Sequence, residues 1–328
     1  MSLRIGPVRL DNPVVLAPMS GVTDLPFRRL VKRWGAGLVV SEMIASKAMI
    51  HAARRTLRMS RTTPEEWPMA VQLAGCEPEV MAEAARLNAD QGAAIIDINM
   101  GCPVKKVVNG DAGSALMRDE GLAGRILAAV VKAVNLPVTL KMRTGWDHTS
   151  RNAPRLARIA EDCGVQAVTV HGRTRCQFYK GRADWAYIGE VKAAVGIPVI
   201  GNGDVCAEDD AVRLLELSGA DGVMVGRGAY GRPWFLDQVR HFLDTGTRLP
   251  DPPPQGQLET VLKHYEDMLT HYGSEPGTRV ARKHIGWYSK GLPGSAEFRA
   301  RVNRESRPDA VRAMIRDLYA PLIDRKAA

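Results

Sequence analysis

Eight short runs of apolar and β-branched residues recur between positions 14 and 225, and they are the feature that most restricts the fold. They are Val14 to Ala17, Leu38 to Val40, Met69 to Leu73, Ala93 to Ile98, Val138 to Met142, Ala167 to Val170, Pro198 to Ile200 and Gly222 to Val225. Longer stretches of helical period, such as 77–91 and 121–134, separate most of them. Strands that are apolar throughout are typical of parallel sheets covered by helices on both faces. Eight such units predict an α/β fold, a (β/α)8 TIM barrel, with an open doubly wound sheet as the alternative.

The segments on either side of these units follow other patterns. Residues 3–10 turn at Gly6 and Pro7 and predict a hairpin that closes the barrel floor. The stretch 244–256, DTGTRLPDPPPQG, is too rich in Pro and Gly to continue a helix or strand. Beyond it the period is helical, with breaks expected at 272–277 and 291–294. We therefore expect a barrel over 1–243, a linker over 244–256 and a small all-helical domain over 257–328.

Composition narrows the class of protein further. With 328 residues, 45% hydrophobic and 25% charged, the chain is an ordinary globular protein, and its net charge of +9 favours a polyanionic partner such as nucleic acid. The first residues lack the pattern of a signal peptide, and the apolar run 126–134 is too short for a bilayer and contains Lys132. We expect a cytoplasmic protein with no membrane segment. The five cysteines have no zinc-type spacing, so no metal site is expected.

Polar residues follow nearly every predicted strand, where the active site of such a barrel lies. Two glycine-rich turns, GNGD (201–204) and GRGA (226–229), follow the seventh and eighth strands. Their backbone N–H groups can approach a phosphate closely, which predicts a phosphorylated cofactor, although plain tight turns are the alternative. A dinucleotide fold is disfavoured, because the chain then enters the proline-rich stretch rather than a strand ending in an acidic residue.

Two further residues at this rim bear reactive groups. Lys141 ends a strand that should face the barrel interior, where its ammonium needs a negative partner: either a cofactor or a neighbouring carboxylate. Cys102 lies beyond a strand end, between Gly101 and Pro103, where a core-filling role is less expected than an exposed one. A thiol with an ordinary pKa of about 8.5 could donate a proton near neutral pH, unless Lys105 or Lys106 lowers that value.

Basic residues gather in two parts of the sequence. The loops of the barrel mouth carry Lys105, Lys106, Arg143, Arg173, Arg175, Lys180 and Arg182. The helical domain carries Arg279, Arg282, Lys283, Lys290, Arg299, Arg301, Arg304 and Arg307. Only Glu297 and Glu305 oppose the second set between positions 279 and 307. Such clusters attract a polyanion to the site, so we expect both to contact RNA.

Several motifs together resemble the tRNA-dihydrouridine synthases, over nearly the whole chain. They are APMSGVTDLPFR (17–28), DINMGCP (97–103), LKMRTGW (140–146), VHGRT (170–174), GNGD (201–204) and VGRGAYGRPW (225–234). In the helical domain ARKHIGWY (281–288) resembles the bacterial B-type subgroup.

The resemblance implies an FMN-dependent enzyme that uses NADPH to reduce specific D-loop uridines of tRNA to 5,6-dihydrouridine. It implies that hydride adds at C6 of uracil and that Cys102 is the general acid that protonates C5. The implied FMN contacts are Pro18, Met19, Ser20, Gln72, Lys141, His171, Asn202, Gly203, Asp204, Gly226 and Arg227. Together with the basic clusters, it implies tRNA contacts at Lys105, Arg143, Arg173, Arg175, Arg282 and Lys283. We expect a monomer.

Two other functions remain compatible with parts of the pattern. A dihydroorotate-dehydrogenase-like flavin barrel acting on a free pyrimidine would share the FMN site, but it gives no reason for a basic helical extension. A non-catalytic RNA-binding barrel would explain the charge, but neither the interior Lys141 nor the thiol at the rim.

Overall fold

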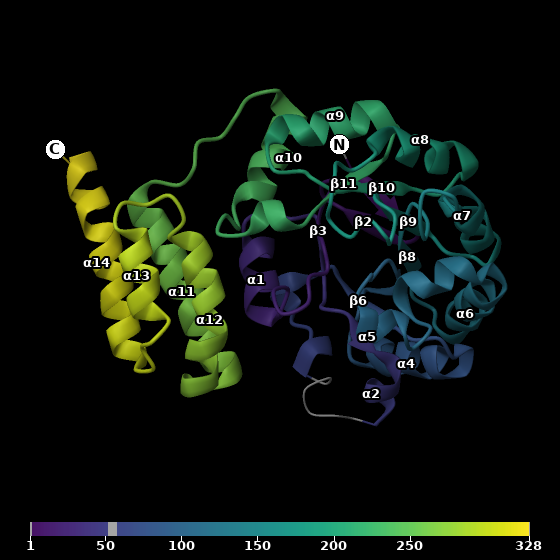
Figure 1. The fold of residues 1–328 in the computed structure, drawn as a ribbon, viewed down its shortest axis with the longest axis horizontal. Coiled ribbons are helices and arrows are strands. Elements are labelled where there is room, and N and C mark those ends of the chain that lie inside the picture. The colour runs from purple at the N-terminus through teal and green to yellow at the C-terminus, as the bar shows by residue number, and fades with distance from the viewer. Residues whose placement is uncertain (1, 52–57, 328) are drawn as a thin grey trace. The chain divides into compact units, whose positions relative to one another are not determined.

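The computed structural model describes residues 2–51 and 58–327. Within these residues, eight parallel strands close into a barrel with helices outside it (Figure 1). In order around the barrel they are β3 (Val14–Leu16), β4 (Leu38–Val40), β6 (Met69–Ala74), β7 (Ile95–Met100), β8 (Val138–Arg143), β9 (Ala167–His171), β10 (Val199–Asn202) and β11 (Gly222–Val225). Because β11 pairs with β3, the TIM-barrel prediction is confirmed and the open sheet is wrong.

Several strands extend further than the apolar runs predict. β7 begins at Ile95 and runs on to Met100, because Asn99 and Met100 pair with Lys141 and Met142 of β8. β9 and β10 likewise include His171 and Asn202 at their ends. These polar residues therefore lie on the sheet rather than in flexible loops. A short additional strand, β5 (Ile44–Ala45), pairs with β6 and was not predicted.

The helices of the first part of the chain surround the barrel. They are α1 (Leu25–Arg33), α2 (Ser46–Ile50), α4 (Pro78–Asp90), α5 (Lys105–Val108), α6 (Glu120–Ala133), α7 (Ala153–Asp162), α8 (Trp185–Ala194), α9 (Glu208–Ser218) and α10 (Phe235–Thr245). The carboxylates of Asp24, Asp119 and Asp184 accept hydrogen bonds from the first turns of α1, α6 and α8. Three 3-10 turns, η1 (Pro64–Glu66), η2 (Gly113–Arg118) and η3 (Arg227–Ala229), lie between elements of this part of the chain.

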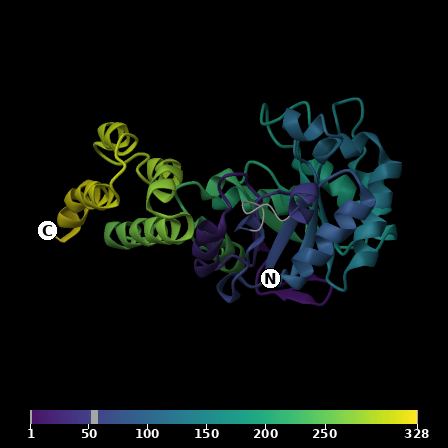
Figure 2. The same ribbon diagram turned by 90° about the horizontal axis from the view of Figure 1, so that it is seen from below.

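An antiparallel hairpin, β1 (Leu3–Ile5) and β2 (Val8–Leu10), precedes the barrel, as predicted. Its buried side chains join the core cluster that includes Val15, Ile95 and Ala167, which lie at or near the first residues of their strands. The hairpin thus closes the end of the barrel opposite the catalytic mouth expected for this fold. Figure 2 shows the hairpin at the edge of the barrel near the N-terminus.

The chain divides into two compact units. One contains Met1–Gly228 and Leu236–Arg248, and the other contains Ala229–Phe235 and Leu249–Ala328. The second unit is built from α11 (Pro254–Tyr272), α12 (Ser274–Tyr288), α13 (Ser295–Val302) and α14 (Pro308–Ala327), which surround an apolar core.

Two details of this region differ from the sequence prediction. α11 already begins at Pro254, because proline is tolerated in the first turn of a helix, so the proline-rich stretch is non-helical only over 246–253. The expected break at 272–277 shrinks to Gly273, whose φ of 89° suits glycine. Within the described residues, no helix is long and apolar enough to cross a membrane.

A buried ion pair ties α1 to the turn η1. The guanidinium of Arg28 donates to Glu66 over 2.7 Å and 3.2 Å, and neither side chain has any exposed surface. Arg28 also donates to the backbone carbonyls of Thr23 and Arg61, so its donors are well used. Glu65, the neighbouring residue, pairs with Arg29 and Arg33 at the surface, where its side chain is 49% exposed.

Replacing Glu66 with Ala should lower the free energy of unfolding by about 3 to 5 kcal/mol, because it leaves the Arg28 charge buried without its partner. Replacing Glu65 with Ala should cost about 1 kcal/mol or less, since solvent screens that pair. Urea denaturation followed by circular dichroism measures both. Equal losses in the two variants would contradict the assignment.

Candidate active site

The loop that carries Cys102 is held from three sides. The Oδ1 atom of Asn99 accepts hydrogen bonds from the backbone N–H groups of Gly101 and Cys102, at 3.1 Å and 2.9 Å. The hydroxyl of Ser114 donates to the carbonyl of Cys102 over 2.7 Å, and Nε of Arg143 donates to the carbonyl of Gly101 over 2.8 Å. The thiol therefore lies on a fixed loop directly after β7.

The surroundings of Cys102 favour its protonated form. Burial raises the pKa of the thiol, and the nearby cations Arg143 and Lys141 only partly oppose that effect. Lys105 and Lys106, which the sequence suggested as the residues that could lower it, are exposed on α5. A protonated thiol at neutral pH can act as a proton donor.

Asp97 lies inside the barrel, below this loop, and sequence reasoning missed it. The parallel register makes Gln72 of β6, Asp97 of β7 and Thr139 of β8 partners in one row. Gln72 donates to Asp97 over 2.7 Å and Thr139 donates over 2.6 Å, while only 5% of Asp97 is exposed. Burial raises the pKa of this carboxyl to about 6, against the effect of both hydrogen bonds. One charged residue within the otherwise apolar run 93–98 was the available signal in the sequence.

Lys141 lies two residues above Thr139 on β8, on the same face of the strand. Its ammonium is half-buried and donates to Oδ1 of Asn202 over 3.2 Å, and Asn202 in turn donates to the carbonyl of Met224. Burial lowers the pKa of Lys141 to about 8, although the charge of Asp97 opposes this. Among the described residues no carboxylate pairs with Lys141, so the salt bridge considered from the sequence is not present there.

The two glycine-rich turns present backbone donors at the same ends of the strands. Within the described residues, the backbone N–H groups of Gly203, Asp204, Gly226 and Arg227 have no hydrogen-bond acceptor. Gly203 has a φ of 122°, and a Cβ atom there would lie 2.8 Å from the side chain of Ala183. Four unpaired N–H groups at the starts of two turns fit a phosphate group. Together with the Lys141 ammonium, they fit a phosphorylated cofactor such as FMN.

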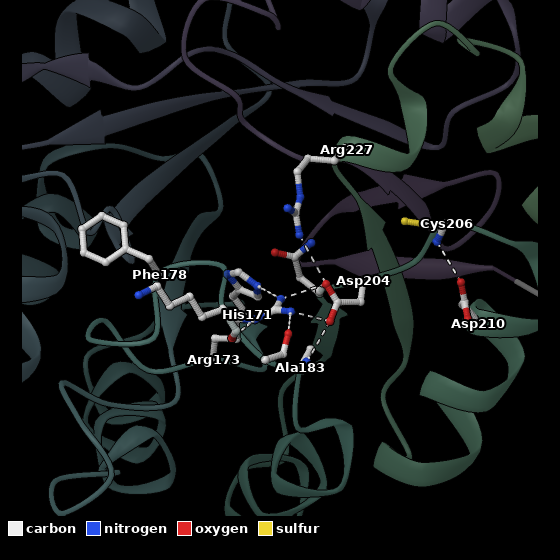
Figure 3. Close-up of polar contacts among 12 residues, drawn as sticks. His171, Arg173, Phe178, Ala183, Asp204, Cys206, Asp210 and Arg227 are labelled. Atoms are coloured by element: carbon white, nitrogen blue, oxygen red, sulfur yellow. Dashed lines mark hydrogen bonds and ion pairs between the residues drawn. The ribbon is translucent and has the colours of Figure 1, made fainter. Parts of the chain in front are cut away.

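Two arginines donate hydrogen bonds to the carboxylate of Asp204. Figure 3 shows Arg173 between Asp204 and His171, with Arg227 reaching Asp204 from another side. Arg173 donates to both carboxylate oxygens, at 2.8 Å and 2.6 Å, and Ala183 donates its N–H over 2.8 Å. Burial raises the pKa of Asp204, but these hydrogen bonds outweigh that effect and hold the pKa below its ordinary value. Asp204 is therefore suited to contact an anion through its backbone, not its carboxylate.

His171 is buried beside this cluster. Burial first, and then the surrounding cations Arg143, Lys141 and Arg173, lower the pKa of His171 well below its ordinary value, so the ring is neutral. Because arginine can only donate, Nε2 of the ring serves as the acceptor of the 3.4 Å contact from Arg173. This assignment leaves Nδ1 as the protonated nitrogen.

The remaining predicted residues fall into three groups. Pro18, Met19 and Ser20 form the turn after β3, in which Thr23 accepts a hydrogen bond from the Met19 N–H. Lys105 is exposed, and Arg175 is half-buried with its guanidinium 4.6 Å from the ring of Trp146. Arg282 and Lys283 lie in the second unit.

Two cations expected to contact RNA are instead parts of the barrel interior. Arg143 and Arg173 are each only 2% exposed. Arg143 donates to the backbone carbonyls of Gly101, Thr174 and Phe178, so it ties two loops together. The guanidinium groups of Arg143 and Arg173 are thus engaged mainly by the protein itself, and little of their surface is exposed to solvent, unlike the exposed role that the sequence suggested.

The second unit contains a basic cavity of about 720 Å³. Its cationic lining residues are Arg279, Arg282, Lys283, Lys290 and Arg299. Trp287 also lines it, stacked on Tyr230 with ring centroids 4.1 Å apart, and among the described residues no acidic side chain does so. Arg282 is half-buried and donates to the carbonyl of Glu305, which holds it in place. The positive charge and the half-buried aromatic ring suit a nucleic acid.

Comparison with known proteins gives a consistent result. A family model described as dihydrouridine synthase (Dus) matches residues 15–320. A "Probable tRNA-dihydrouridine synthase" of Rickettsia bellii is 59% identical over 325 residues, 99% of this chain and 100% of the relative. Proteins named "tRNA-dihydrouridine synthase B" from Xanthomonas axonopodis and Pseudomonas aeruginosa are 54% and 49% identical, over 98% and 97% of this chain and 97% and 96% of their own lengths.

The raised pKa of Asp97 predicts a specific dependence of stability on pH. A carboxyl whose pKa is about 6 in the folded protein and about 3.8 in the unfolded chain contributes stability below pH 4 that is lost as the pH rises through 6. Relative to Asp97→Asn, the wild-type protein should lose about 3 kcal/mol of unfolding free energy between pH 4 and pH 8. Melting temperatures of both proteins across this range measure the difference, and parallel curves would show that the pKa is not raised.

Proposed function

The chain belongs to the dihydrouridine synthase family, and we propose that it reduces uridines of tRNA to 5,6-dihydrouridine, with Cys102 as the general acid. The observation that carries this proposal is the Cys102 loop. A protonated thiol is fixed at the mouth of the barrel, beside a half-buried ammonium and two turns with unpaired N–H donors. The names of the relatives point to the same substrate class.

The cofactor we propose is FMN, and the residues present fit it. The N–H groups of Gly203, Asp204, Gly226 and Arg227 would hold its phosphate, and Lys141 would lie against its negatively charged ring edge. When bound, FMN would supply the hydride that reduces the C5=C6 bond, with NADPH as the source of electrons. The neutral His171 and the Asn202 amide would bound the cofactor pocket at the ends of β9 and β10.

The chain's own chemical contribution is a proton. Reduction at C6 of uracil leaves negative charge spread over C5 and the C4 oxygen, and C5 must then receive a proton. Cys102 would donate it from the S–H group, since its raised pKa keeps it protonated at neutral pH. Arg143 and Ser114 hold the loop in place, and the positive charge of Arg143 would stabilise the Cys102 thiolate left after the transfer until solvent returns a proton to it.

The domain arrangement we propose assigns the cofactor and the thiol to the barrel, over 1–243, and tRNA binding to the helical region 257–328. The basic cavity of the second unit supports this division. A free pyrimidine substrate, the rival interpretation, would give this cavity no role. We further propose that the target lies in the D-loop, that the protein acts as a monomer, and that it works in the cytoplasm, where its tRNA substrate is found.

Replacing Cys102 with Ala should lower dihydrouridine formation by about 100-fold to 10,000-fold, because it removes the general acid. FMN content and the rate of flavin reduction by NADPH should stay at wild-type values. Mass spectrometry of an unmodified tRNA transcript, incubated with protein and NADPH, measures the product. Cys176→Ala, which removes an exposed thiol, is the matched control. Full yield from Cys102→Ala would rule out this residue as the acid, and no product from the wild type would overturn the function.

Replacing Lys283 and Lys290 together with Ala should flatten the dependence of log affinity for tRNA on log salt by about 1.5 units, since each lost phosphate contact removes about 0.7 to 0.9. Lys263→Ala combined with Arg86→Ala removes the same charge outside the cavity, from side chains already paired with Asp267 and Glu83, and should leave the slope unchanged. Filter binding at several salt concentrations measures both slopes. Identical slopes in the two double variants would contradict tRNA binding in this cavity.

A further inference from the structure

A continuous chain of side-chain hydrogen bonds joins the barrel interior to the Cys102 loop. Asp97 accepts from Nε2 of Gln72 over 2.7 Å, and Oε1 of Gln72 accepts from Nδ2 of Asn99 over 2.7 Å. Oδ1 of Asn99 then accepts from the N–H groups of Gly101 and Cys102. Asp97, Gln72 and Asn99 are 5%, 1% and 7% exposed, so water competes little for these bonds.

The two amides in this chain can each lie in two orientations, and their neighbours select one. An ionised carboxylate can only accept, so Gln72 must turn its NH2 group towards Asp97. Its oxygen then faces Asn99, which must turn its own NH2 group towards Gln72. The oxygen of Asn99 is thereby left facing the loop, where two backbone N–H groups need an acceptor. Each orientation follows from the one before it.

We propose that Asp97 is a positioning residue that sets the orientation of the Gln72 and Asn99 amides and through them fixes the loop that carries Cys102. The proposal rests on the function of Cys102 proposed above. It explains why a carboxyl group is kept in the barrel interior, where burial is costly. Thr139 is the other donor to Asp97 and stands outside this chain, because it has no hydrogen bond to either amide.

The sheet register explains why Asp97 can act at this distance. Gln72 and Asp97 are directly paired on β6 and β7, and Asn99 lies two residues beyond Asp97 on the same face of β7. The amide of Gln72 therefore connects Asp97, in its own row of the barrel, with Asn99 in the next row. Cys102 lies just past the strand end, where the last acceptor of the chain, Oδ1 of Asn99, holds its N–H.

A reversal of the hydrogen-bond chain tests this idea. In Asn99→Asp, the new carboxylate also needs the NH2 group of Gln72, so two acceptors compete for one donor and the loop loses its anchor. In the double variant Asp97→Asn with Asn99→Asp, Gln72 can turn around, accept from residue 97 and donate to residue 99. The far carboxylate oxygen at position 99 again accepts from the loop.

The measured quantity is the alkylation rate of Cys102 by iodoacetamide at pH 8, quantified on the tryptic peptide of the FMN-loaded protein. Cys176, an exposed thiol, is the internal reference in each sample. We expect Asn99→Asp to raise the rate about tenfold or more. Asp97→Asn should change it by about threefold or less, because the amide oxygen that remains at position 97 can still accept from Gln72, and the double variant should return close to Asp97→Asn. Thr139→Val, a polar-to-apolar change in the same row, is the control for general loosening and should have little effect.

Each outcome decides the matter. A double variant as reactive as Asn99→Asp, or a Thr139→Val variant equally reactive, would overturn the proposal. If Asn99→Asp alone fails to fold, a folded double variant supports the proposal, while a double variant that also fails to fold, when Asp97→Asn folds, refutes it. Dihydrouridine formation is measured in parallel. A wild-type protein that makes none, with alkylation rates as expected, would refute the proposed function while the positioning role stands.

Discussion

The parallel register of the closed barrel is the constraint on which the site depends. Pairing of β11 with β3 closes the sheet. In a closed sheet each strand can have only one register relative to its two neighbours. Because alternate residues of a strand face inward, the register places Gln72, Asp97 and Thr139 in one row and brings Asn99 beside Lys141. A shift of one residue in β7 would turn Asp97 and Asn99 away from the interior and separate both from Gln72.

Buried charge is the second organising feature of the molecule. Arg28, Asp97, Arg143 and Arg173 are almost completely buried. The three arginines donate hydrogen bonds to carboxylate or carbonyl oxygens, and Asp97 accepts hydrogen bonds from neutral donors. Arg28 ties helix α1 to the turn η1, whereas Arg143 and Arg173 tie the loops at the strand ends to one another. Their cost is acceptable where the backbone must stay in one conformation, as it must around a reactive thiol.

The two units divide the proposed work according to their chemistry. The barrel has strand ends that converge, which suits a cofactor and a single proton donor. The helical unit has an apolar core that includes Tyr265 and Tyr319, and its basic side chains are left for a cavity at its surface. Long-range attraction of a polyanion needs many exposed cations but no exact geometry, whereas proton transfer needs exact geometry in one place.

The sequence by itself determined the barrel, the hairpin floor and the helical second unit, because the period of apolar residues reports directly on which faces are buried. It also singled out Cys102 and Lys141. Only the tertiary structure decided that Arg143 and Arg173 are interior residues and that Asp97 contacts Gln72, since these facts depend on contacts between residues up to 42 positions apart. The sequence shows which residues are charged, but it does not show what surrounds each charged side chain. Only the packed fold decides whether that side chain contacts solvent or a backbone carbonyl group.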